Sequence, residues 1–177
     1  MKLIFRCLLI YLVFSFAISY GFVRSKLSDG SLLYFNGTSE EVQIDYDLSE
    51  LNLEEGLLLT YLEYLEGSFK EELGVDVTFN PEISNDSLFI LKSSSDASYF
   101  SSNSVAAITK ITYDEKGLIL LAEIIINLNV ALSSSESDYN YFGNVISHEL
   151  GHLFGLDHST SWSSTMAPDL SYGQYSY

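Results

Sequence analysis

The chain has 177 residues, with 24 Asp and Glu against eight Lys and Arg, and its formal net charge is −16. That length suits a single domain with a sizeable apolar core. The negative charge argues against nucleic acid or an anionic membrane as a partner. It is compatible with Ca²⁺ binding and with basic peptides as ligands, although a solvated acidic face on an exported protein is the simpler explanation.

The first residues have the pattern of a secretory signal peptide. Lys2 and Arg6 precede an apolar run over residues 7–18, and Ala17-Ile18-Ser19 supplies small residues for cleavage. The run is shorter than the roughly 20 residues of a membrane-spanning helix, which makes an uncleaved anchor the weaker alternative. We therefore expect a signal peptide over residues 1–19, no stable membrane insertion after its removal, and a protein secreted to the extracellular space, the periplasm or the cell surface.

The rest of the chain is expected to be one domain with a short extension. Residues 20–40 contain Gly30 and Gly37 without a clear periodicity, which predicts an N-terminal extension to a domain over residues 41–177. The single cysteine, Cys7, lies in the predicted signal peptide. The exported chain would then have no disulfide, so packing and bound metal would have to stabilise it.

The first half of the domain predicts a strand, a helix and two further strands. Residues 42–46 alternate apolar and polar side chains, as in a half-buried strand. Asn52 and Glu55 suit a helix start, and Gly74 suits its end. One apolar stripe runs along this helix through Leu57, Leu58, Tyr61, Leu62, Leu65, Phe69 and Leu73. Strands over residues 75–79 and 88–91 follow, and a right-handed crossover predicts parallel pairing.

The second half predicts a β-hairpin and a long helix. Residues 107–113 and 118–128 flank the turn 114–117, after a serine-rich loop over residues 93–104. The second arm is apolar on both faces and should be central, whereas the first arm is more polar and should be an edge strand. A polar linker over residues 131–138 leads to a helix over residues 139–154. Its sheet-facing side is apolar, with Phe142, Val145, Ile146, Leu150 and Leu153.

The most informative stretch closes this helix and reads H-E-x-x-H-x-x-G-x-x-H over residues 148–158. His148 and His152 are one helical turn apart, so both rings can reach one ion. Glu149 is placed to take a proton from a metal-bound water, and Gly155 allows the chain to turn and bring His158 back as a third ligand. A helix carrying two histidines by chance is the alternative. It is disfavoured because all three histidines of the chain lie in this pattern.

Met166 lies eight residues after His158, and with this methionine the sequence resembles the metzincins. Within that group it is similar to the matrixins in having Gly151, Ser159 and Pro168 at these positions. The resemblance implies an α+β, zincin-like fold: a twisted mixed sheet, a backing helix, an active-site helix, a Met-turn and a short C-terminal part. It also implies a zinc endopeptidase that uses one catalytic Zn²⁺.

The resemblance also implies roles for individual residues. His148, His152 and His158 would be the zinc ligands, Glu149 the general base, and Met166 a structural residue beneath the metal. In matrixins the hairpin strand beside the cleft pairs with an extended peptide substrate. This implies substrate binding by the edge strand, at Ala107, Ile108, Thr109 and Lys110. An edge strand that merely faces water is the alternative.

The sequence also departs from the matrixins in three respects. It has no propeptide cysteine that could cap the zinc, no fourth histidine for a structural zinc, and only 11 residues after Met166. We therefore expect an open pocket beyond Met166, or one completed by a partner or a second copy. Two other functions remain open: a zinc-binding or inhibitory protein with little turnover, and an acidic adhesion or matrix component. Glu149 disfavours both, since zinc binding needs only the histidines. The substrate and the oligomeric state are left open.

Overall fold

The computed structural model describes residues 24–35, 41–51, 55–102, 104–130, 136–160 and 164–167. The predicted signal peptide and the chain after Ala167 lie outside the described residues. None of the helices in the described ranges is long and apolar enough to cross a membrane.

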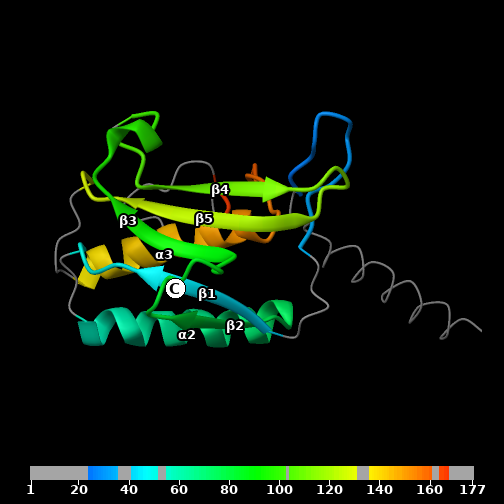
Figure 1. Cartoon of the computed structure of the whole chain (residues 1–177). Helices are drawn as coiled ribbons and strands as arrows, with labels where there is room; N and C mark the ends of the chain where they lie inside the picture. Colours follow the sequence, from blue (N-terminus) through cyan, green and yellow to red (C-terminus); the bar gives the residue numbers. More distant parts are fainter. Residues whose placement is uncertain are drawn as a thin grey trace, which may run out of the picture.

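A five-stranded mixed sheet forms the centre of the fold (Figure 1). Its strands are β1 (Glu41–Asp47), β2 (Asp76–Asn80), β3 (Phe89–Ser94), β4 (Ala107–Tyr113) and β5 (Ile119–Asn127), in the spatial order β2-β1-β3-β5-β4. β1 pairs in parallel with β2 and β3, β3 pairs in parallel with β5, and β4 is antiparallel to β5. The predicted parallel pairing of β1 with β2 and the predicted hairpin are therefore confirmed.

The two strands of the hairpin occupy the positions in the sheet that their composition predicts. β5, which is apolar on both faces, lies inside the sheet, and β4 is an edge strand. β3 continues to Ser94, three residues beyond its predicted end, because it stays paired with β5 as far as Asn127. Ladder pairing thus outweighs the weak strand preference of the serines. The rest of the predicted loop contains one 3-10 turn, Ala97–Tyr99.

Two helices cover one side of the sheet (Figure 1). α2 (Glu55–Leu73) buries Leu58, Leu62 and Leu65, and it ends at Gly74 in the left-handed conformation with φ of 68°. The side chains of Leu57 and Leu73, which belong to the predicted stripe, lie outside the described residues. α2 and the apolar face of α3 share one core with the sheet.

The active-site helix α3 (Glu136–Leu153) begins earlier than predicted. The expected linker over residues 131–138 is wrong for its last three residues, since acidic side chains suit the first turn of a helix, where the macrodipole is positive. All five predicted apolar residues of α3 are buried. The fold is therefore α+β, with a mixed sheet, a backing helix and an active-site helix as predicted.

Residues 24–35, the N-terminal strap, pack against two distant turns. Tyr34 accepts a hydrogen bond from Ile119 N and donates one to Gly117 O, both of 2.9 Å, at the β4–β5 turn. At the other end of the strap, Ser25 N donates to Gly155 O over 3.0 Å, just after α3. Leu33 between them is buried. A segment without sequence periodicity therefore connects the hairpin to the turn that follows the active-site helix.

Because the strap packs against one glycine and not another, we expect alanine substitutions at the two positions to lower stability by different amounts, although both glycines have the same backbone conformation. Gly117 and Gly30 have φ of 88° and 86°, but a Cβ at Gly117 would lie 2.5 Å from Leu32 O, whereas a Cβ at Gly30 would meet nothing within 4 Å. Both alanine variants carry the conformational strain, and only Gly117→Ala adds a clash. We expect Gly117→Ala to lower the free energy of unfolding by about 1–3 kcal/mol more than Gly30→Ala in urea titrations. Equal losses would show that the strap is not docked on the hairpin.

Candidate metal centre and active site

The last turns of α3 bring two histidine rings together. His148 and His152 project from neighbouring turns, with ring centroids 4.7 Å apart and Nε2 atoms 3.1 Å apart. Helical geometry alone produces this closeness, since residues four apart lie on one face. His148 is buried and His152 is half-buried, so the pair lies at the boundary between the core and solvent.

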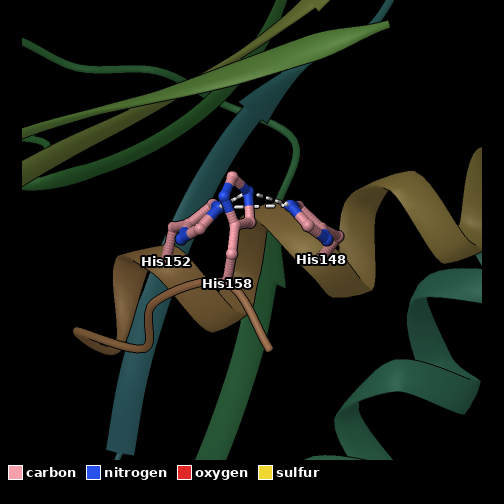
Figure 2. Close-up of side chains that lie close together, drawn as sticks. All are labelled: His148, His152 and His158. Carbon is pink, nitrogen blue, oxygen red and sulfur yellow. Dashed lines mark hydrogen bonds between the residues drawn. The ribbon is translucent and has the colours of Figure 1, made fainter. Parts of the chain in front are cut away.

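The third histidine reaches the pair because the helix ends at Gly155. Gly155 has φ of 81°, and a Cβ there would lie 2.9 Å from Leu33 O in the strap. Glycine is thus required both by the backbone conformation and by the close approach. After this turn the chain returns, and His158 Nε2 lies 3.3 Å from Nε2 of both His148 and His152 (Figure 2).

Main-chain carbonyls orient two of the three rings. His148 Nδ1 lies 2.7 Å from Thr165 O, and His152 Nδ1 lies 2.8 Å from Leu156 O. A carbonyl oxygen can only accept a hydrogen bond, so Nδ1 of each ring carries the proton. The Nε2 lone pairs of both rings are therefore directed at the space between the three histidines. Such partners of the second ring nitrogen are typical of metal-binding histidines.

The geometry of the three nitrogens fits zinc. Two Nε2 lone pairs held 3.1 Å apart repel one another unless a cation lies between them. Tetrahedral Zn²⁺ with Zn–N bonds of about 2.0–2.1 Å would place its nitrogen ligands about 3.3–3.4 Å apart, close to the observed separations. Three imidazoles also leave a fourth position for water or substrate.

No second metal site is evident in the described part of the chain. There, the three histidines are the one group of three or more His, Cys, Asp or Glu side chains that could hold an ion. The structure gives no support to the Ca²⁺ that the acidic composition suggested.

The surroundings of His148 and His158 favour the neutral form of these two rings. Burial lowers the pKa of His148 to about 4, although the hydrogen bond to Thr165 opposes this, and burial also lowers the pKa of His158. Imidazole must be neutral to donate its lone pair to a metal. The lowered pKa values of these two residues therefore favour the form that binds metal.

Glu149 lies beside this centre as a buried carboxylate. Its side chain is 7% exposed, and its Oε2 accepts a hydrogen bond of 2.6 Å from Thr109 Oγ1 on β4. Burial raises the pKa of the Glu149 carboxyl, while the Thr109 hydrogen bond and the charge of His152 oppose the shift. A carboxyl whose pKa is raised toward neutrality is a better proton acceptor and donor near pH 7.

Met166 lies under the active-site helix, next to Gly151. It is buried, and a Cβ at Gly151 would lie 2.2 Å from its sulfur. Met166 O accepts a hydrogen bond of 2.7 Å from Ser159 N, so the turn is tied to the residue after His158. Thr165 of the same turn orients His148. The turn thus supports two of the histidines, and the described contacts of Met166 are structural.

The N-terminal strap also reaches this centre. Ser25 Oγ donates to Leu156 O over 3.2 Å, and this is the carbonyl that accepts the His152 Nδ1 proton. Residues 20–40 were expected to be only an extension, and Ser25 was not expected to contribute. No sequence pattern marks it, since the contact joins residues 131 apart in the chain.

An open cleft of about 470 Å³ runs between β4 and the histidines. Of the four residues expected to bind substrate, Ala107, Ile108 and Thr109 line it. Lys110 does not line the cleft, and its Nζ lies 4.0 Å from the centre of the Tyr99 ring. Tyr141 and Val145 of α3 form part of the opposite wall. These two residues were not predicted as part of the site, and Thr109 was predicted only to bind substrate, not to contact Glu149.

Comparison with known proteins agrees with this geometry. The sequence model of the matrixin family matches residues 69–176, more than half of the chain. No curated protein matches the sequence. Among solved structures, archaemetzincin from Methanopyrus kandleri is similar, with a TM-score of 0.55 and 15% identity over 77% of this chain and 86% of that one. This likeness shows a shared fold. The match to the family model shows that the chain belongs to the matrixin family of zinc metallopeptidases.

Proposed function

We propose that the protein is a secreted, zinc-dependent endopeptidase in which His148, His152 and His158 hold Zn²⁺ and Glu149 is the general base. One observation carries the proposal: a buried carboxylate lies next to three converging imidazoles at the floor of an open cleft. A site that only binds zinc needs the histidines and has no use for a buried acid beside them.

Each group has a defined task in peptide hydrolysis. Zinc, when bound, supplies a Lewis acid that polarises the scissile carbonyl and lowers the pKa of its water. Glu149 accepts a proton from the attacking water and then donates it to the leaving amine. The carbonyls of Thr165 and Leu156 keep the His148 and His152 rings in the required orientation.

The substrate class follows from the edge strand along the cleft. Among the described strands, β4 pairs only with β5, so its other edge can pair with an extended peptide. Backbone hydrogen bonds along Ala107–Lys110 would hold the peptide without regard to its sequence. This supports a peptide or protein substrate whose scissile bond lies over the histidines.

Secretion is proposed on the sequence alone. The apolar run over residues 7–18, preceded by Lys2 and Arg6, has the features of a signal peptide. An exported peptidase would act outside the cytosol on peptides or proteins there.

A zinc-binding protein without turnover is the alternative, and Glu149→Gln separates the two functions. Glutamine keeps the size and the hydrogen-bond acceptor of Glu149 but cannot take a proton. We expect the variant to bind one zinc per chain, as the parent does, and to lose peptide hydrolysis by about 10²–10⁴-fold. Zinc content and cleavage of a quenched fluorescent peptide library measure the two properties.

Glu115→Gln, in the exposed β4–β5 turn, is the control and should match the parent in both assays. If Glu149→Gln cleaved peptides at the parental rate, Glu149 would not be the base. If the parent bound zinc but cleaved nothing in the library, the non-catalytic alternative would be favoured.

Backbone pairing along β4 predicts a specific effect of N-methylation on peptide substrates. A methyl group on a peptide nitrogen removes one ladder hydrogen bond and keeps the side chain. Scanned along a good substrate, N-methylation should raise KM most at alternate residues, since only every second residue of a strand directs its N–H at one neighbour. Measured kcat and KM for the series check this. A uniform effect at all positions would contradict pairing with β4.

A further inference from the structure

We infer that Thr109 is a positioning residue for Glu149, and that it links the orientation of the base to the strand on which the substrate pairs. The inference rests on the proposed function, because it gives Thr109 a part in the same reaction. It concerns a contact between a strand and a helix that are 40 residues apart in the chain.

The Thr109 hydroxyl makes two contacts with one residue. Its Oγ1 lies 2.6 Å from Glu149 Oε2 and 3.1 Å from Glu149 O. A hydroxyl has a single proton, and the shorter distance assigns that proton to the carboxylate. The carbonyl offers a second acceptor, so the hydroxyl keeps a partner when the carboxyl is protonated at Oε2.

This hydrogen bond leaves one carboxylate oxygen for chemistry. With Oε2 held by Thr109, the lone pairs of Oε1 remain to accept the proton of a water. A glutamate side chain has three rotatable bonds, and a base that samples several rotamers is in position for only part of the time. Fixing Oε2 from β4 removes that freedom.

Thr109 is well placed to act as this anchor. Neither of the two ion pairs formed by the described residues includes Glu149, so a neutral hydroxyl is the strand's contribution to the buried carboxylate. Thr109 itself is fixed by the ladder, where it lies opposite Ile124 of β5. Its hydroxyl therefore has a stable position relative to α3.

The location of Thr109 on the edge strand gives the contact a second consequence. The main chain of Thr109 lies in the segment proposed to pair with a peptide, while its side chain touches the base. One residue would therefore hold both the bound peptide and the base. Loss of the hydroxyl would leave the peptide bound but the base misaligned, so the effect should appear in kcat rather than in KM.

Three variants test the inference in the zinc-loaded protein. Thr109→Val keeps the shape and removes the hydroxyl, and Thr109→Ser keeps the hydroxyl. Thr78→Val is the matched control, since the Thr78 hydroxyl on β2, at the opposite edge of the sheet, lies 3.4 Å from the Glu41 carboxylate. Loss of one hydrogen bond to a charged group predicts a fall in kcat of about 10- to 100-fold for Thr109→Val.

The KM and the zinc content of Thr109→Val should stay within about twofold of the parent. Thr109→Ser should recover kcat to within a few-fold, and Thr78→Val should be unchanged. A parental kcat for Thr109→Val would overturn the inference. So would a fall in kcat that Thr109→Ser fails to recover, because the loss would then come from packing.

A second measurement needs no activity. At saturating zinc, urea unfolding of the parent, Thr109→Val, Glu149→Ala and the double variant forms a thermodynamic cycle. We expect non-additive effects, with Thr109→Val costing less stability once Glu149 is absent. Additive effects would overturn the inference even if the enzyme were active. If the parent cleaved no peptide but the cycle were non-additive, the proposed function would fail while the contact itself remained established.

Discussion

The main constraint on this structure is that the fold holds the Nε2 atoms of three histidines close together, where their lone pairs repel one another. Three Nε2 atoms lie within 3.3 Å of one another, and the carbonyls of Thr165 and Leu156 direct at least two of the lone pairs at a common point. Without a cation this arrangement raises the free energy of the folded state, so packing elsewhere must offset the repulsion. Metal binding then removes it. The turn at Gly155 and the buried Met166 both serve this purpose: they hold the chain after α3 against the helix.

The sheet contributes to the same centre from the other side. β4 is at once the edge of the sheet, one wall of the cleft and the source of the Thr109 hydroxyl. The strap connects the β4–β5 turn to the carbonyl of Leu156, so the hairpin and the helix end are held in one unit. Direct hydrogen bonds therefore join the candidate metal centre to the proposed substrate strand, both through Thr109 and through the strap.

The sequence predicted those features that depend on local periodicity and on special residues. Alternation and helical stripes gave the strands and helices, and Gly155 and the spacing of the histidines gave the convergence at His158. Features produced by tertiary contact were not predictable in this way. β3 continues through serines because β5 is beside it. Ser25 and Thr109 contact residues 131 and 40 positions away, and a single hydroxyl leaves no pattern in a sequence.

The central claim is that the three histidines together hold one zinc ion, and X-ray absorption at the zinc edge tests it most directly. The account predicts one zinc per chain with three nitrogen ligands and one oxygen ligand at about 2.0–2.1 Å. It also predicts that His158→Ala loses one nitrogen ligand, most of the affinity for zinc and the thermal stabilisation that zinc confers. A parental spectrum and an unchanged melting temperature for His158→Ala at saturating zinc would contradict the account.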